Sequence, residues 1–288
     1  MAEDIHRFQK YFQEHANDWS LASHTENDGY FPVARERALK SINSILKHSI
    51  VTGNALDIGS GPGIFSALLA ENGYAVTGVD FSTEMIALTQ RYPLVKYQME
   101  LGRLNFELGH WEEVLFQKET GSACLITALG FIYYLENPDL FYTQASRLLS
   151  KDGLLVVSYR NKDFNRSNNF FSAQLNWILQ NIDHFSRKEW FDQINIGLNS
   201  SFAYSKDDKK FPMPDLPRNS VNEFSDFQNR FNLEIVEIQG IHGHLLHPAF
   251  DNNSIAKLID TLSAPLSSIY GGDLLWYSHF LVTYKKMD

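Results

Sequence analysis

The sequence predicts an α/β protein built on a mostly parallel β-sheet with helices on both faces. Short apolar runs at 74–80, 123–128 and 154–159 have the length and composition of buried strands. Segments with helical periodicity separate these runs, and such alternation favours a parallel sheet whose two faces are covered. A glycine-rich stretch follows the first expected strand, and we expect the functional site near it.

The glycine-rich stretch runs from Asn54 to Phe65 and reads Asn-Ala-Leu-Asp-Ile-Gly-Ser-Gly-Pro-Gly-Ile-Phe. An apolar run that ends in Asp57 and Ile58 predicts a buried parallel strand. Glycines at alternate positions permit positive φ angles and let a ligand approach the backbone closely. The open amides at the start of the next helix favour a negative group. The stretch therefore predicts a site for a nucleotide-type cofactor.

The glycine spacing argues against two common nucleotide motifs. A dinucleotide-binding Gly-x-Gly-x-x-Gly that begins at Gly59 needs glycine where the chain has Ile64. The phosphate-binding motif that ends in Gly-Lys-Ser or Gly-Lys-Thr is absent from the sequence. A second expected strand ends in Asp80, where a carboxylate accepts hydrogen bonds from both ribose hydroxyls. A nicotinamide-dependent oxidoreductase is therefore disfavoured, although it stays an alternative.

Composition sets further bounds. The 288 residues, 44% of them hydrophobic, are enough for one large domain or for one core with a sizeable insertion. A formal charge of −9 leaves no basic stripe, which argues against nucleic acid as a partner. The single cysteine, Cys124, lies in an apolar run, so we expect a buried structural thiol. The N-terminus is unlike a signal peptide and no apolar run is long enough to span a bilayer, so we expect a soluble cytoplasmic protein.

The remaining elements follow from periodicity and from helix start and stop signals. Proline at its start and one apolar face predict a helix over 32–48. Ser82 is a good N-cap for the next helix after the second strand, and 94–101 either extends that helix or forms an added turn. Further strands are expected at 104–108, 233–239 and 274–284, and further helices at 3–15, 138–149 and 253–263.

Changes in composition divide the chain into four parts. We expect an N-terminal helical cap at 1–50, a cofactor-binding core at 51–160, an insertion at 161–230, and C-terminal strands at 231–288 that complete the sheet. The insertion between the fifth and sixth strands is rich in Asn, Ser, Phe and Trp. We expect it to hold two helices, near 171–182 and 187–198, and to act as a lid that selects the substrate.

Four segments together resemble a known family. They are Leu56–Gly63, Val79–Ser82, Ala128–Phe131 and Arg147–Leu154, and the set is similar to the class I S-adenosylmethionine-dependent methyltransferases of small-molecule type. The resemblance covers 54–160 clearly and the end of the chain weakly. It implies a Rossmann-like sheet of seven strands with the last one antiparallel. It also implies S-adenosyl-L-methionine as methyl donor and S-adenosyl-L-homocysteine as product.

The resemblance implies roles for individual residues. Asp57 and the glycines would face the methionine half of the cofactor, Asp80 would hold the ribose, and Phe81 and Met85 would lie near adenine. The N-terminal part would close over the cofactor, with Arg35 pairing with its carboxylate. The expected cofactor contacts are Tyr11, Tyr30, Arg35, Asp57, Gly59, Ser60, Gly61, Gly63, Asp80, Phe81, Met85, His110, Trp111 and Leu129.

One departure from the family concerns adenine. Many members carry Gly-Asp after the third strand, and the acid contacts the adenine amino group. This chain has Gly109 and His110 there. Either the His110 imidazole accepts through one nitrogen, or Trp111 and Glu112 take over that edge.

The expected chemistry is an in-line displacement in which positive charge leaves sulfur. Alignment of the reacting atoms lowers the barrier, and aromatic ring faces attract the cation. Phe131, Tyr133 and Tyr134 follow the fourth strand at the edge where open α/β sheets bind ligands, although core packing explains them equally well.

An oxygen acceptor needs a base, whereas a neutral amine needs only to be uncharged. His242 and His244 lie after the sixth strand and point to the same side of an extended chain. They and Tyr134 are the catalytic candidates; the two histidines otherwise have structural roles. A metal site is disfavoured because no carboxylate cluster accompanies them. The expected substrate contacts are Tyr133, Tyr159, Arg160 and Asn161.

The sequence thus predicts an S-adenosylmethionine-dependent methyltransferase that acts on an oxygen or nitrogen of a small molecule, such as a sugar or hydroxylated metabolite. The first alternative is a methyltransferase-like fold that serves as a non-catalytic binding or regulatory protein. Neither the acceptor nor the oligomeric state follows from the residues.

Overall fold

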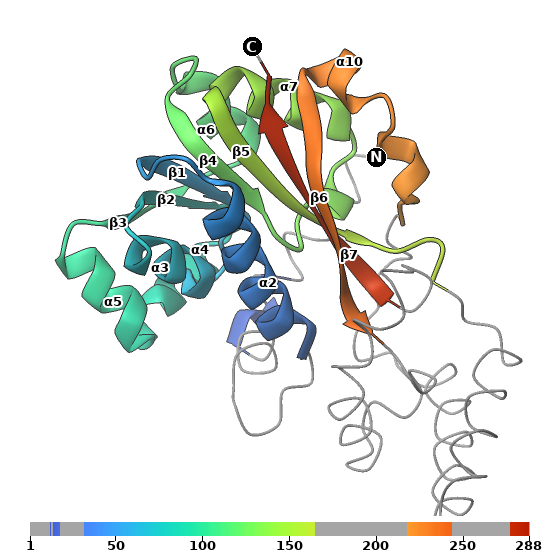
Figure 1. The fold of residues 1–288 in the computed structure, drawn as a ribbon. Coiled ribbons are helices and arrows are strands. Elements are labelled where there is room, and N and C mark those ends of the chain that lie inside the picture. Colours follow the sequence, from blue (N-terminus) through green and yellow to red (C-terminus); the bar gives the residue numbers. More distant parts are fainter. Residues whose placement is uncertain (1–11, 13, 18–31, 165–217, 244–276, 288) are drawn as a thin grey trace, which may run out of the picture.

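The computed structural model describes residues 12, 14–17, 32–164, 218–243 and 277–287 (Figure 1). Within them, seven strands form one sheet in the order β3-β2-β1-β4-β5-β7-β6. β7 is antiparallel to both of its neighbours, whereas β1 to β5 pair in parallel. This confirms the expected sheet. The strands are β1 (Asn54–Ile58), β2 (Ala75–Asp80), β3 (Leu104–Leu108), β4 (Ala123–Ala128), β5 (Leu149–Arg160), β6 (Leu233–Gly243) and β7 (Tyr277–Lys286).

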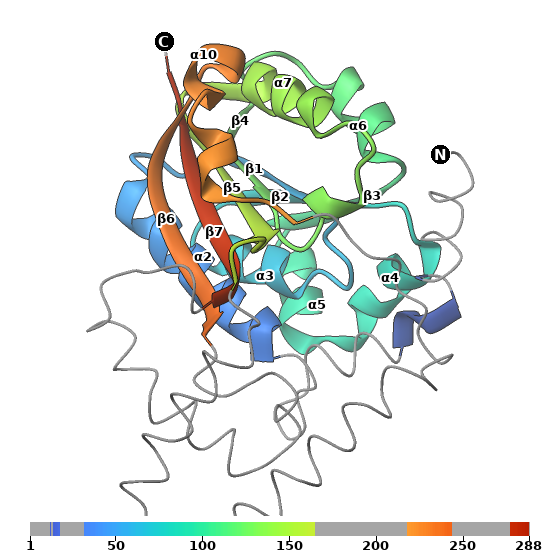
Figure 2. The same ribbon diagram turned by 90° about the vertical axis from the view of Figure 1, so that its right-hand side faces the viewer.

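Helices cover both faces of the sheet (Figures 1 and 2). One face packs against α2, α3 and α5, and the other against α6, α7 and α10. The helices are α2 (Pro32–His48), α3 (Ile64–Glu71), α4 (Thr83–Leu88), α5 (Pro93–Glu100), α6 (Trp111–Gln117), α7 (Pro138–Leu148) and α10 (Phe227–Phe231). In the described residues, no helix has the length and apolar character needed to cross a membrane.

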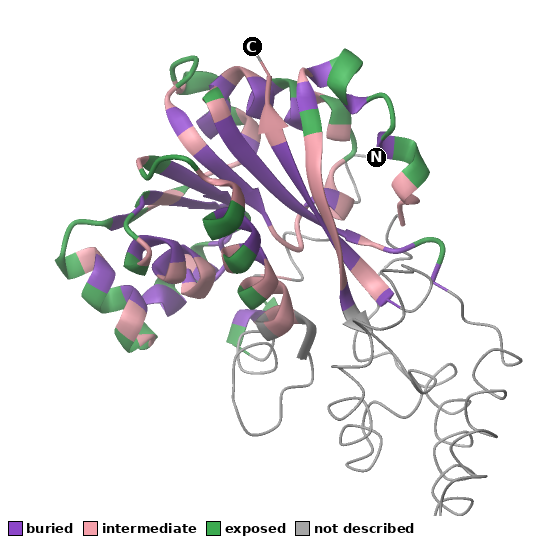
Figure 3. Ribbon diagram, viewed as in Figure 1, coloured by how far each residue is buried: buried purple, intermediate pink, exposed green. Residues whose placement is uncertain are grey.

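The central strands are buried on both sides (Figure 3). Leu56 and Ile58 of β1 pack toward α6 and α7, whereas Ala55 packs toward α2 and α3. Because both faces of a parallel sheet are covered, such strands are continuously apolar and do not alternate with polar residues. This is why the apolar runs in the sequence predict strands.

Several expected elements are confirmed, and others need correction. The strands at 104–108 and 123–128 and the helix at 32–48 have the expected bounds, and the segment at 94–101 is a separate helix, α5, with Pro93 at its start. β5 begins five residues earlier than expected, at Leu149. The expected helices at 3–15 (apart from residues 12, 14 and 15), 171–182, 187–198 and 253–263 lie outside the described residues.

Helix α6 is absent from the sequence-based prediction. It spans seven residues, too few to show a helical period, and its buried side chains are Trp111, Val114 and Leu115. Glu112 and Glu113 stand in its first turn, where carboxylates stabilise a helix, and they were its only local signal.

The expectation that Cys124 is buried is also corrected, since this residue is partly exposed.

The insertion leaves and rejoins the sheet at one place, the carboxyl end of β5. Lys162 N donates to Asn219 O, and Asn219 N donates to Arg160 O, each at 2.9 Å. Both ends of the segment 163–218 are therefore attached at this edge. Phe224 and Phe227, from the part that the sequence grouped with the insertion, pack with Phe231 in the core beside α7.

Candidate functional site

The loop after β1 is attached to the end of β2 by backbone hydrogen bonds. Gly59 N and Ser60 N both donate to Val79 O, at 2.9 and 3.1 Å. The loop therefore lies over the carboxyl ends of the central strands, where open α/β sheets bind ligands (Figure 2).

The three loop glycines adopt a backbone that other residues rarely adopt. Gly59, Gly61 and Gly63 have φ angles of 72°, 53° and 79°. A Cβ added to Gly59 would lie 2.8 Å from the Phe131 ring, and one added to Gly63 would overlap the Phe106 ring. The glycines are thus required both by the backbone and by the side chains packed beneath the loop.

Asp57 holds the loop from below. Its side chain is 2% exposed. Its Oδ2 accepts from Ser66 Oγ at 2.6 Å and its Oδ1 accepts from Thr127 Oγ1 at 2.7 Å. Burial raises its pKa, while the two hydroxyls and the charge of Arg37 oppose that rise. Asp57 therefore ties α3 and β4 together, and its expected contact with the cofactor stays a prediction.

Asp80 lies at the end of β2 and faces the loop. Its Oδ2 accepts from Gly61 N at 2.8 Å and its Oδ1 accepts from Ser82 N at 2.9 Å. Burial raises the pKa of Asp80 to about 6, and the nearby charge of Asp57 adds to the rise. Each carboxylate oxygen keeps a second acceptor position, so the pair of ribose hydroxyls is a fitting ligand.

Ser60 supplies an independent sign of a ligand. Its Oγ is buried and has no hydrogen-bond partner in the described structure. It lies beside Gly78 of β2, where an added Cβ would come within 2.9 Å of it. A buried hydroxyl without a partner is costly, and a polar ligand in the loop would satisfy it.

Aromatic side chains line the β2 and β3 side of the site. Phe81 stacks on His110, with ring centroids 6.0 Å apart. Phe12, from the N-terminal part, lies edge-on to Phe81 at 6.4 Å and to Tyr134 at 5.5 Å. Tyr133 contacts Tyr134 at 4.8 Å. The structure thus brings four expected site residues into one aromatic wall, together with Phe12, which sequence reasoning missed.

Two expected adenine contacts lie deeper than this wall. Trp111 is 8% exposed and packs edge-on against Phe131 and Phe141 in the core. Met85 is 2% exposed and packs with Ala16. The structure gives both residues packing roles, because their local sequence shows helix position but not which face points to the site.

Arg37 is a site residue that sequence reasoning missed. It belongs to α2, and its guanidinium lies against Gly130, where an added Cβ would be 2.6 Å from Nη1. Gly130 N donates to Ser158 Oγ at 2.7 Å. No carboxylate of the described chain is within ion-pair distance of Arg37, so an anionic ligand fits. The expected residue was Arg35, two positions earlier and on another side of the helix, whose side chain lies outside the described ones.

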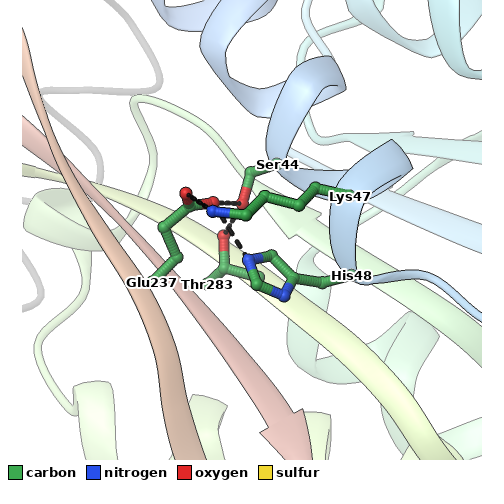
Figure 4. Close-up of polar contacts among 5 residues, drawn as sticks. All are labelled: Ser44, Lys47, His48, Glu237 and Thr283. Carbon is green, nitrogen blue, oxygen red and sulfur yellow. Dashed lines mark hydrogen bonds and ion pairs between the residues drawn. The ribbon is translucent and has the colours of Figure 1, made fainter.

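A polar network, here the α2 anchor, fixes α2 to the sheet (Figure 4). It consists of Ser44, Lys47, His48, Glu237 and Thr283. Ser44 Oγ lies 2.5 Å from Glu237 Oε2 and 2.6 Å from Thr283 Oγ1. Lys47 Nζ lies 2.7 Å from Glu237 Oε1, and His48 Nε2 lies 3.2 Å from Glu237 Oε2. Partial burial alone would raise the pKa of Glu237, but hydrogen bonds from Lys47 and Ser44 lower it. The carboxylate is therefore ionised at neutral pH.

The anchor sets the position of α2 along β6. Nearer the site, Lys40 Nζ donates to Gly240 O at 2.6 Å. Arg37 lies about one turn before Lys40, so contacts along the helix decide where its guanidinium lies.

Two expected substrate contacts are buried. Tyr159 is fully buried, and its hydroxyl bonds to those of Tyr142 at 2.7 Å and Tyr284 at 2.8 Å. Asn161 is 1% exposed, and its Nδ2 donates to Tyr277 O at 2.8 Å. The structure does not support a substrate contact for either, because their side chains point into the protein. Their position at a strand end was the only signal, and it does not tell one face from the other.

Other expected residues remain at the site or lie outside the description. Arg160 and Leu129 are partly exposed at the carboxyl ends of β5 and β4. The residues that lie outside the description are Tyr11, Tyr30 and His244, and the side chain of His242.

Known proteins place the chain in a family. A model of the methyltransferase domain matches residues 30–201, which is more than half of the chain. The chain belongs to the class I S-adenosylmethionine-dependent methyltransferases. Membership confirms the expected enzyme class and cofactor, and the buried Ser60 hydroxyl, Asp80 and Arg37 fit that cofactor's polar groups.

The similar proteins differ in what they are named for. The ubiquinone biosynthesis O-methyltransferase of Coxiella burnetii is 25% identical over 159 residues, which cover 53% of this chain and 61% of that protein. Magnesium protoporphyrin IX methyltransferase from Synechocystis PCC 6803, solved with S-adenosylhomocysteine, has a TM-score of 0.58 at 13% identity and covers 97% of this chain and 98% of its own. The [4+2]-cyclase SpnF has a TM-score of 0.51 at 12% identity and covers 86% of this chain and 80% of its own. The curated match spans about three fifths of the relative, and the structural likenesses show the fold alone.

Substituting Gly63 with alanine tests the loop geometry. The Gly63→Ala variant puts a Cβ at positive φ and against the Phe106 ring, so we expect a loss of about 1–3 kcal/mol in the free energy of unfolding, measured by urea denaturation. Adding Phe106→Leu should restore part of the loss, since only the overlap is relieved. Full stability of Gly63→Ala alone would contradict the loop conformation.

A double-mutant cycle tests the α2 anchor. We expect Glu237→Gln to weaken S-adenosylhomocysteine binding several-fold, measured by calorimetry, because α2 and Arg37 lose their position. In a protein that carries Arg37→Gln, the same change should have less than a twofold effect. The matched control is Lys285→Gln on β7, which removes an ion pair with Asp152 of β5 and should leave binding unchanged. Equal losses in both backgrounds would show that the anchor does not act through Arg37.

Proposed function

We propose that the protein transfers the methyl group of S-adenosylmethionine to an oxygen or nitrogen atom of a small molecule. The carrying observation is that the Asp80 carboxylate, the Ser60 hydroxyl and the Arg37 guanidinium face one site above the carboxyl ends of β1, β2 and β4. Asp80 fits the ribose hydroxyls. Arg37 fits the carboxylate of the methionine half.

The bound cofactor supplies a methyl group on a positively charged sulfur, which leaves as a neutral thioether when the acceptor attacks. The chain's part is to align the two reactants and to exclude water. Tyr133 and Tyr134 follow β4, shortly after Gly130, against which Arg37 lies. Their ring faces would attract the sulfonium. The Phe12 ring contacts both Tyr134 and Phe81 edge-on.

The acceptor side is assigned to the insertion and the neighbouring strand ends. Because the insertion is rooted at the end of β5, we propose that 161–230 shapes the acceptor pocket, with the cap at 1–50 closing over the cofactor. The curated relative is named as an O-methyltransferase, which supports an oxygen acceptor. In that case His242, His244 or Tyr134 takes the proton from the hydroxyl group.

A second candidate is a protein of this fold that binds the cofactor without transferring its methyl group. The likeness to a [4+2]-cyclase supports this second candidate, since that protein has a similar fold and is named for a reaction other than methyl transfer.

A labelling experiment separates the two functions. We expect the protein to transfer tritium from methyl-labelled S-adenosylmethionine to a small molecule in a metabolite extract, with release of S-adenosylhomocysteine, measured by chromatography with radiometric detection. Arg37→Gln should reduce the transfer at sub-saturating cofactor. Tight cofactor binding with no labelled product and no S-adenosylhomocysteine would support the binding protein instead.

Asp80 predicts a pH dependence of cofactor binding. Its pKa of about 6 means that the carboxylate becomes protonated as the pH falls through 6, so the affinity for S-adenosylhomocysteine should fall there and be constant above pH 7. Asp80→Asn should weaken binding by about 1–3 kcal/mol and remove that pH dependence, measured by calorimetry from pH 5 to pH 8.

The stability of the free protein should show the opposite sign. A carboxyl group whose pKa rises from 3.8 to about 6 on folding contributes stability below 3.8, and this contribution is lost as the pH rises through 6. If S-adenosylhomocysteine binding by Asp80→Asn keeps the pH dependence of the unmodified protein, this carboxylate is excluded as the ribose ligand.

A further inference from the structure

Arg160 and His279 lie opposite each other at the carboxyl end of β5. Arg160 ends β5, His279 is near the start of β7, and the antiparallel register pairs them directly. Side chains at directly opposite positions stand on the same face, with Cβ atoms about 5 Å apart. Both residues are partly exposed. The carboxyl end of β5 lies beside the start of β7 (Figure 1).

This pair faces the same side as the cofactor site. Side chains alternate along a strand, so Arg160 shares its face of β5 with Ser158, whose Oγ accepts from Gly130 N. On β7, His279 shares its face with Thr283, which contacts Ser44 of α2. Two residues of a strand span about 7 Å, so Arg160 begins about that distance beyond Ser158.

The charges around Arg160 point to an anionic ligand. No carboxylate of the described chain forms an ion pair with it, although the chain has 34 acidic against 25 basic residues. Lys162, two positions further, does have a partner, because its Nζ lies 3.7 Å from Glu223. A partly buried guanidinium without a counter-ion suits a carboxylate or phosphate, which it binds through two parallel hydrogen bonds.

The imidazole of His279 is restrained beside this guanidinium. Its Nδ1 lies 2.9 Å from Ser278 Oγ. A ring held in this way adds a second hydrogen-bonding group on the same face as Arg160, directly across the strand pair. Arg160 therefore supplies the charge of the pair, and His279 lies directly across from it on the same face.

We propose that Arg160 and His279 bind an anionic group, carboxylate or phosphate, of the methyl acceptor. The assignment of the occupant to the acceptor rests on the proposed function, in which Arg37 holds the cofactor's own carboxylate. Arg37 lies against Gly130 and Arg160 stands two residues beyond Ser158, so one anionic group of each reactant would be held near the Gly130–Ser158 hydrogen bond. The acceptor is thus a small acid that is methylated at another atom or at that same acidic group.

Anion binding to the protein tests this pair without knowledge of the acceptor. The probes are inorganic phosphate and acetate, titrated by NMR into the full-length protein saturated with S-adenosylhomocysteine, so that Arg37 is already occupied. We expect saturable binding of at least one anion. Arg160→Gln should weaken it at least tenfold and His279→Asn several-fold. Lys162→Gln removes the same charge from a position two residues further along and should change the binding less than twofold. The tighter of the two probes distinguishes a phosphate from a carboxylate acceptor.

Three results would overturn the pair as an anion site. They are the absence of saturable binding of both probes, equal losses in Arg160→Gln and Lys162→Gln, and unchanged binding in Arg160→Gln with an unchanged melting temperature. Anion binding at Arg160 can also be measured without S-adenosylhomocysteine in a protein that carries Arg37→Gln, and we expect the same affinity there. Failure to bind S-adenosylhomocysteine with retained anion binding at Arg160 would therefore contradict the proposed function and leave the anion site intact.

Discussion

The hydrogen bond from the Gly61 amide to the Asp80 carboxylate connects the two strands on which the site depends. It joins the loop after β1 to the end of β2, and the bonds from Gly59 N and Ser60 N to Val79 O strengthen the same connection. Only residues that tolerate positive φ let the loop fold back far enough to make these bonds. The glycines therefore serve the chemistry indirectly, since they bring a carboxylate and a row of amides to one place.

This arrangement places two buried carboxylates, Asp57 and Asp80, on neighbouring strands. The charge of Asp57 raises the pKa of Asp80, and burial raises the pKa of both carboxyl groups. The structure offsets the cost for Asp57 with two hydroxyl groups and with the charge of Arg37, and for Asp80 with two backbone amides. A ligand that brings ribose hydroxyls and a positive sulfur relieves the remaining cost, so the free site already favours such a ligand.

The parts of the fold that the sequence predicts are those with a local physical cause. β4 can be predicted because both of its faces are buried, which makes its sequence continuously apolar. The glycine loop can be predicted because the glycine spacing matches a backbone with repeated positive φ angles. Arg37 was missed because its role depends on where α2 lies on the sheet, which residues far along the chain, such as Glu237, decide. Tyr159 was assigned to the substrate because strand ends carry function, but the side of the sheet to which it points is a tertiary property. Helix α6 was missed because seven residues contain too little periodicity.

The α2 anchor fixes the position of Arg37 although it lies away from the candidate site. Arg37 is a long side chain on a helix that precedes the core in the chain. Ser44, Glu237 and Thr283 are short or well-bonded groups, and they fix the helix more rigidly than contacts at its exposed end would. A polar network is also more directional than apolar packing, so it selects one register of α2 on β6. The position of Arg37, which we propose as a ligand of the cofactor's carboxylate, is therefore decided by hydrogen bonds made further along α2.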